Sequence, residues 1–199
     1  MSEESKSGIP EPGWSSRAND PEILAGLERN RKAALKWGCV TVLLALAVPP
    51  AISHFVEDSL KMDDAVKMGC VIAGAIIVFS LLSKFFKSRE KPYEGVVVDK
   101  REEIVHRAGK KSDTYSTEYV TYVKRTDGGK AKIKEAHARA SSAWNYLKVG
   151  ERFRYHPHLT FPYELYDKAK AEHLYCPVCS RANDVAADRC SRCHAPLLK

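Results

Sequence analysis

The chain has 199 residues, 44% of them hydrophobic, and a formal net charge of +7. A basic chain usually suggests a nucleic-acid ligand, but most of this positive charge flanks two long apolar runs and favours a membrane protein instead. The sequence contains no GxSxG, P-loop, GxGxxG or HExxH motif, so we predict that the protein is not an enzyme.

Residues 1–19 are predicted to form a disordered N-terminal tail. They are rich in Ser, Pro, Gly and Glu and show no apolar period. Trp14 is then an isolated, exposed aromatic residue. The first apolar run starts too late for this segment to be a signal peptide.

Residues 20–36 are predicted to form an amphipathic juxtamembrane helix. Asp20 suits the N-cap, and Pro21 suits the first helical position. Apolar residues then recur at helical spacing among Arg and Lys, which favours a helix lying on the inner leaflet. A helix that binds a partner protein is the alternative. The apolar residues are Ile23, Leu24, Leu27, Ala34 and Leu35.

Two apolar runs, residues 37–56 and 66–86, predict a two-helix transmembrane hairpin. The first has 20 residues without Asp, Glu, Lys or Arg, and the second has 16 uncharged residues between flanking lysines. A hydrocarbon core of about 30 Å needs about 20 helical residues, so the first run just suffices. The lysines that flank the second run, Lys67 and Lys84, can snorkel to the membrane interface. A pair of buried core helices in a soluble domain is the alternative. Pro49 and Pro50 predict a kink in the first helix.

The charges beside these runs predict the orientation of the hairpin. Basic residues precede the first run and follow the second, whereas the connection, residues 57–65, is mainly acidic. Positive flanks favour the cytoplasmic side. We therefore predict a multi-pass protein of the inner cell membrane with both termini in the cytoplasm and residues 57–65 as an extracytoplasmic loop. The flanking basic residues are Arg29, Arg31, Lys32, Lys36, Lys84, Lys87, Arg89 and Lys91.

Small residues lie on one face of the second run. Gly69, Ala73 and Gly74 allow another helix to approach closely. This face can serve the hairpin itself or a homodimer, and both uses stay open. Neither run has an ionisable residue deep inside it, so a single copy offers no obvious pore or proton path.

Residues 92–172 are predicted to form a small cytosolic β-domain. Runs rich in Val, Tyr and Thr are separated by turn signals, and a short helix is expected within residues 136–147. About five short strands predict an antiparallel barrel or sheet of the SH3 or OB size class, which makes the fold class α+β. The expected core is Val96, Val98, Ile104, Tyr119, Val123, Ile133, Trp144, Leu147, Val149, Phe153, Tyr155 and Tyr166.

Two features of this domain leave second interpretations open. His156 and His158 lie one residue apart, which on a strand places both imidazoles on one face. A metal pair is therefore the alternative to a solvated loop. The domain is also basic and rich in tyrosine, so nucleic-acid binding on an OB-like face is the alternative to solvated strands beside an anionic leaflet.

Four cysteines near the C-terminus carry the strongest chemical signal. Cys176 and Cys179 form one CxxC, and Cys190 and Cys193 form a second, with ten residues between the pairs. Two such turns complete a tetrahedral Cys₄ site for structural Zn²⁺, so residues 175–197 are predicted to form a zinc ribbon. Iron in the same geometry is the alternative. A cytoplasmic location disfavours disulfides, and no βαβ pattern supports a redox CxxC.

The tail around these cysteines has few apolar side chains, so we expect metal binding to supply its folding energy. His173 and His194 adjoin the cysteines and are spare ligand candidates. Cys39 and Cys70 lie inside the apolar runs and are interpreted as packing residues. Three nearby arginines are expected to offset the negative charge of the site: Arg181, Arg189 and Arg192.

The stretch CPVCSRAND…RCSRCHAPL resembles the short zinc-ribbon tails found on many bacterial membrane and regulatory proteins. In those tails a CPxC turn is followed by Asn, a second CxxC and Pro-Leu. Two apolar helices followed by a β-domain ending in KVGERFRYHP also resemble uncharacterised membrane-anchored bacterial proteins. The resemblance implies a bound metal and no named activity. The matching residues are Cys176, Pro177, Cys179, Asn183, Cys190, Cys193, Pro196 and Leu197.

These features together predict an integral membrane adaptor or scaffold. The lipid bilayer and a partner protein are its expected partners, with the β-domain and the zinc ribbon presented for protein–protein interaction. The alternative is a membrane-tethered regulator or nucleic-acid binder that uses the basic β-domain and the ribbon. An enzyme or redox protein using the tail cysteines is a third class, and it would show thiol turnover or iron absorption.

Overall fold

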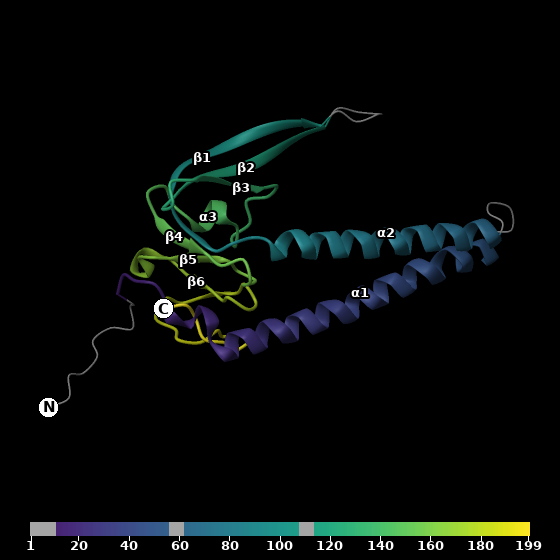
Figure 1. The fold of residues 1–199 in the computed structure, drawn as a ribbon, viewed down its shortest axis with the longest axis horizontal. Coiled ribbons are helices and arrows are strands. Elements are labelled where there is room, and N and C mark those ends of the chain that lie inside the picture. The colour runs from purple at the N-terminus through teal and green to yellow at the C-terminus, as the bar shows by residue number, and fades with distance from the viewer. Residues whose placement is uncertain (1–10, 56–61, 108–113) are drawn as a thin grey trace. The chain divides into compact units, whose positions relative to one another are not determined.

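The computed structural model describes residues 11–55, 62–107 and 114–199. The fold class is α+β, as predicted, with two long helices, an antiparallel sheet and a C-terminal tail (Figure 1). Contacts divide the chain into two units. One unit is Glu28–Glu90, and the other joins the chain up to Leu27 with Lys91–Lys199.

The two long helices are α1, Pro21–Phe55, and α2, Met62–Ser88. The stretches Pro21–Ile52 and Asp63–Ser83 are long and apolar enough to cross a membrane, and only 6% and 17% of their most apolar parts are buried within the chain. The core helices of a soluble domain are mostly buried, so the exposure of these two stretches disfavours that alternative.

The predicted juxtamembrane helix and first apolar run form one continuous helix. α1 begins at the predicted proline and continues through Pro49 and Pro50. Residues 1–10 of the predicted tail and 57–61 of the predicted loop lie outside the described residues, and the chain from Met62 onward already belongs to α2.

Small residues of α2 allow the two helices to approach closely. Ala65 and Ala73 are buried, and a Cβ atom added to Gly69 would lie 3.1 Å from the carbonyl oxygen of Ala45 in α1. Gly74, in contrast, has no atom within 4 Å of an added Cβ. The predicted small-residue face therefore serves the hairpin at Gly69, while its use in a homodimer stays a prediction.

The β-domain is a five-stranded antiparallel sheet with the order β3-β2-β1-β4-β5. The predicted antiparallel sheet is thus confirmed. β3 and β5 form its two edges, and β1 is paired with β2 along most of its length. The strands are β1 Tyr93–Arg107, β2 Thr114–Arg125, β3 Lys130–Glu135, β4 Arg152–Tyr155 and β5 Tyr163–Leu165.

The core of the sheet differs from the prediction in β1. Val97 is buried, whereas Val98 is 50% exposed and Val96 is half-buried, so the predicted register of this strand is wrong. Three consecutive valines give no alternation from which to read the inward face. Ile104 is 76% exposed because β1 continues past the ends of its pairing with β4. Val149 is also exposed, while the predicted core residues Val123, Leu147 and Phe153 are buried.

The predicted short helix is a single turn, α3, Ala143–Tyr146. The carboxylate of Glu135 accepts hydrogen bonds from the backbone N–H groups of Ala143 and Trp144, at 3.0 and 2.8 Å. Ser142 is its N-cap and accepts a hydrogen bond from the N–H of Asn145. These bonds satisfy the free donors at the start of the turn.

Gly95 of β1 lies closely against β2. A Cβ atom at this position would lie 2.5 Å from Cγ1 of Val123 and 3.0 Å from the carbonyl oxygen of Lys124. Substituting Gly95→Ala should therefore destabilise the β-domain by about 1–3 kcal/mol, because the sheet must open to accept the methyl group. Thermal unfolding of the full chain in detergent, followed by near-ultraviolet circular dichroism, measures the effect.

Gly13→Ala is the matched control, because an added Cβ there has no atom within 4 Å. Equal unfolding temperatures for the two variants would contradict the close contact at Gly95.

Candidate metal centre

The C-terminal tail consists of two turns with the same backbone hydrogen bonds. In the first, the N–H of Cys176 donates to the carbonyl of Arg181 at 2.9 Å, and the N–H of Ser180 donates to the carbonyl of Cys176 at 3.0 Å. The second turn repeats both bonds at Cys190, at 2.9 and 3.0 Å, with Ala195 and His194 as the partners. The short strands β6, Leu174–Tyr175, and β7, Ala182–Asn183, enclose the first turn.

Each turn ends in a left-handed residue directly after its second cysteine. Ser180 has φ 57° and His194 has φ 59°, and they are the non-glycine residues with positive φ in the described chain. Such a conformation is uncommon outside glycine. Its repetition at equivalent positions indicates that both CxxC segments are held in one turn geometry.

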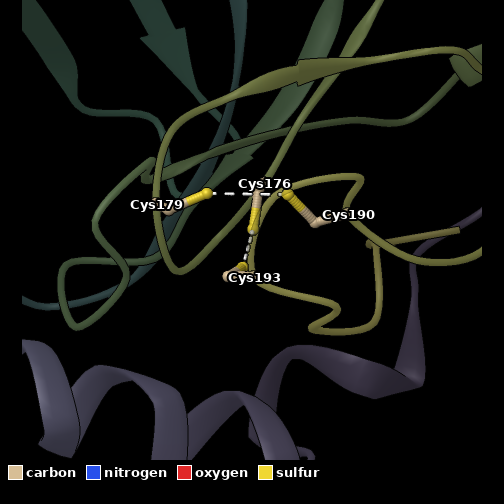
Figure 2. Close-up of side chains that lie close together, drawn as sticks. All are labelled: Cys176, Cys179, Cys190 and Cys193. Carbon is tan, nitrogen blue, oxygen red and sulfur yellow. Dashed lines mark hydrogen bonds between the residues drawn. The ribbon is translucent and has the colours of Figure 1, made fainter.

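The four thiols converge on one point (Figure 2). Cys176 Sγ lies 3.5 Å from Cys193 Sγ, and Cys179 Sγ lies 3.6 Å from Cys190 Sγ. All four sulfurs lie within 4.8 Å of one another. Zinc–sulfur bonds of about 2.3 Å in a tetrahedron place sulfurs about 3.8 Å apart. The spacing therefore fits a shared metal ion, and the cysteines of the described chain are free of disulfides.

The backbone favours negative charge at these sulfurs. The N–H of Val178 donates to Cys176 Sγ and the N–H of Arg192 donates to Cys190 Sγ, both at 3.4 Å. Burial raises the pKa of the Cys176 thiol far above its ordinary value. Burial also opposes ionisation of Cys190, but the N–H groups of Cys193 and Arg192 lower its pKa to about 6. A metal ion that binds four thiolates must displace protons, so its affinity falls as the pH falls.

Asn183 connects the two turns behind the cysteines. Its side-chain nitrogen donates to the carbonyl of Arg181 at 2.7 Å, and its side-chain oxygen accepts from the N–H of Ser191 at 2.9 Å. The residue is buried. Sequence reasoning noticed it only through the resemblance to zinc-ribbon tails, and its position gives the match a physical reason.

The other predicted neighbours of the site have different contacts. Arg189 donates to the carboxylate of Glu22 at 2.6 Å and to the carbonyl of His194 at 3.0 Å. Arg181 and Arg192 are exposed. His173 and His194 are also exposed, and neither belongs to the cluster of potential ligands found in the described chain.

The two histidines of the β4–β5 loop do not form a metal pair. His156 is buried and its Nε2 lies 2.8 Å from Glu164 Oε2, whereas His158 Nε2 lies 3.2 Å from the carbonyl oxygen of Ala18. The solvated loop expected at His156 is equally wrong, because this ring takes part in a buried polar network.

This network centres on Glu164, which sequence reasoning missed. The Lys168 ammonium lies 3.1 Å from Glu164 Oε1, and both side chains are buried. The backbone N–H of Ser15 donates to the same oxygen at 2.6 Å. Burial by itself would raise the pKa of Glu164, but the bonds from His156 and Ser15 and the charge of Lys168 lower it below its ordinary value.

Residues 11–19 are therefore ordered, and the predicted disorder is wrong for them. A 3₁₀ turn spans Ser16–Asn19. The ring of Trp14 lies 5.1 Å from that of Tyr166, and the Arg154 guanidinium lies 4.5 Å from the centre of the Trp14 ring. Trp14 is thus not an isolated aromatic residue.

The first turns of α1 pack against the cysteine tail. Ile23 is fully buried, and it belongs to the same apolar cluster as Cys176, Cys190 and Leu197, with Leu27 packed beside it. Leu24 on the neighbouring face is 45% exposed. Part of the apolar face predicted for the inner leaflet therefore covers the tail instead.

The tail also packs on the β-domain. The ring of Tyr175 lies 4.6 Å from Phe161 and 5.2 Å from Tyr146, and its hydroxyl donates to the carbonyl of Ala140 at 2.7 Å. The N–H of Thr160 donates to the carbonyl of Pro177 at 2.8 Å. These contacts join the first CxxC turn of the tail to the β-domain.

No family model, curated protein or solved structure matches the chain. The functional argument therefore rests on the two apolar helices, the sheet and the cysteine cluster.

Proposed function

We propose that the protein is an integral membrane adaptor that holds a zinc-stabilised domain at the cytoplasmic face of a membrane. The observation that carries this proposal is the four-thiol cluster in a chain with two exposed apolar helices. Four protein ligands fill every position of a tetrahedral ion, so the ion has a structural role and offers no place for a substrate.

The charge distribution supports the orientation and the choice of metal. Basic residues beside both apolar stretches favour the cytoplasm, so both termini and the cysteines lie inside. In this reducing compartment the thiols stay available for a metal ion. Zinc is the proposed ion, in line with the resemblance of the tail to bacterial zinc ribbons, and iron is the alternative.

The basic sheet face disfavours nucleic-acid stacking at one of its aromatic residues, Tyr122. Its Tyr122 ring has the Arg101 guanidinium at 5.5 Å and the Lys132 ammonium at 4.9 Å, and its hydroxyl donates to Glu103 at 2.7 Å. Binding of single strands relies on aromatic rings that are free to stack on bases. Here cations cover the ring, and a carboxylate holds its hydroxyl.

Metal analysis and topology mapping test the proposal. The full chain, purified in detergent, is expected to contain one zinc ion per chain, with no iron absorption. A reporter that works only in the cytoplasm should be active when fused to either terminus, and a reporter that works only outside the cytoplasm should be inactive there. A chain without stoichiometric metal, or a C-terminus outside the cytoplasm, would contradict the proposal. Salt-dependent binding of single-stranded RNA at low ionic strength would favour the regulator instead.

A further inference from the structure

The ordered N-terminal segment has two separate attachments. The first, which we call the latch, joins residues 13–15 to the β-domain. The N–H of Gly13 donates to the carbonyl of Tyr166 at 2.9 Å, and its carbonyl accepts from the Lys168 ammonium at 2.6 Å. Ser15 donates to Glu164. None of these partners lies in the cysteine tail.

The second attachment, which we call the clasp, joins the first turns of α1 to the cysteine tail. Ile23 is fully buried in the cluster that contains Leu197 and Leu198. A Cβ atom at Gly26 would lie 3.0 Å from Cγ1 of Val178, so the backbone of α1 lies directly against the first CxxC turn. All of these contacts lie in one unit of the chain.

An ion pair completes the clasp. The guanidinium of Arg189 donates to both carboxylate oxygens of Glu22, at 2.6 and 3.3 Å. Arg189 directly precedes Cys190, so its backbone position depends on the second CxxC turn.

Most of the surface that receives α1 is built by the two turns that carry the thiols, and Leu159 and Leu174 complete it. Val178 lies between Cys176 and Cys179, and Leu197 follows the second turn, held there by its N–H bond to the carbonyl of Asp188. A tail with this few apolar residues depends on its metal for folding. When the metal leaves, most of the surface that holds Ile23 is lost, whereas the latch keeps its partners in the β-domain.

We propose that the metal ion controls whether the first turns of α1 are docked. The metal-bound tail clasps residues 20–27, which contain the start of α1, and metal loss releases this segment while residues 13–15 stay latched. The inference rests on the metal site of the proposed function and adds a device to it. The state of the metal therefore sets how firmly the first turns of α1, up to Leu27, are held to the tail.

Amide hydrogen exchange of the full chain in detergent tests this device. The amides of Asp20 and Leu24 bond only to neighbouring carbonyls, whereas those of Gly13 and Ser15 bond to the β-domain. Removing zinc with a chelator should speed exchange at Asp20 and Leu24 at least about tenfold, because the end of a helix frays once its packing is lost. Exchange at Gly13 and Ser15 should change less than about twofold, and added zinc should restore the first pair.

A pair of variants separates the clasp from the metal. Ile23→Ser removes the buried side chain without touching a ligand, so it should release Asp20 and Leu24 while the chain keeps its zinc. Leu24→Ser is the matched control on the exposed face and should leave exchange unchanged.

Unchanged exchange at Asp20 and Leu24 after chelation, with faster exchange across residues 176–198, would overturn the clasp and leave the metal site intact. Loss of protection at Gly13 as well would also overturn it, because the two attachments would then be one. A chain that binds no zinc would instead fail at the proposed function, and metal analysis of the same samples distinguishes this case.

Discussion

Substituting Cys190→Ser is expected to unfold residues 176–198 and to leave the five-stranded sheet folded. Cys190 is one of four thiols within 4.8 Å of one another, and it is buried. Structural zinc supplies an apparent 10–16 kcal/mol to small modules of about this kind, far more than the few apolar residues of the tail provide. Losing one thiolate should therefore release both the ion and the tail.

The boundary of the unfolding follows from the packing of the tail. Tyr175 contacts Phe161 and Tyr146 and bonds to the carbonyl of Ala140, so the chain up to Tyr175 should stay attached to the sheet. Limited proteolysis of the full chain in detergent, with mass analysis of the fragments, locates the first accessible bond. Metal content is measured on the same sample.

Cys70→Ser provides the matched control. It makes the same chemical change at an exposed cysteine of α2, outside the cluster. This variant should keep its zinc and resist proteolysis as the parent chain does. A Cys190→Ser chain that retained one zinc ion and a protected tail would show that the thiol of Cys190 is not needed for the site.

Sequence patterns predicted the parts of this molecule whose signal lies in side-chain type and spacing. The two CxxC pairs specify their own geometry, since each cysteine pair must turn toward one ion. Strands were found from runs of β-branched and aromatic residues, and the long helices from apolar length. Inside β1 the pattern failed, because three valines in succession give no period and the pairing with β2 shifts by one residue between Val97 and Asp99.

The N-terminal segment shows why the rest could not be predicted. Its attachment uses the backbone N–H and carbonyl of Gly13 and the backbone N–H of Ser15, groups that almost every residue possesses. The composition of this segment, which is rich in Ser, Pro and Gly, therefore does not indicate that its backbone binds the β-domain. The partners, Glu164 and Lys168, appear in the sequence as ordinary charged residues, and only the fold shows that both are buried. A buried carboxylate beside a buried ammonium needs further hydrogen bonds, and the backbone groups of Ser15 and Gly13 supply them.

The latch rests on a buried ion pair between Lys168 and Glu164. Substituting Lys168→Met should destabilise the β-domain by about 3–5 kcal/mol, because it leaves the buried Glu164 carboxylate without its nearest cation. It also removes the donor to the carbonyl of Gly13. Chemical denaturation of the full chain in detergent measures the loss. Lys170→Met is the matched control: this side chain is 75% exposed and pairs with Asp167, so its loss should cost far less stability than the loss of Lys168.

The pH dependence of the same network separates charge from packing. The folded state lowers the pKa of Glu164, so its ionised form contributes stability above the ordinary carboxyl pKa of about 4.3 and loses it as the pH falls through the lower folded value. A Glu164→Gln variant lacks this contribution, so the advantage of the parent chain over it should be constant near neutral pH and shrink below about pH 4.3. An advantage that grew on acidification would mean that burial, which favours the neutral carboxyl, outweighs His156, Ser15 and Lys168 together. The ionised Glu164 carboxylate would then destabilise the latch.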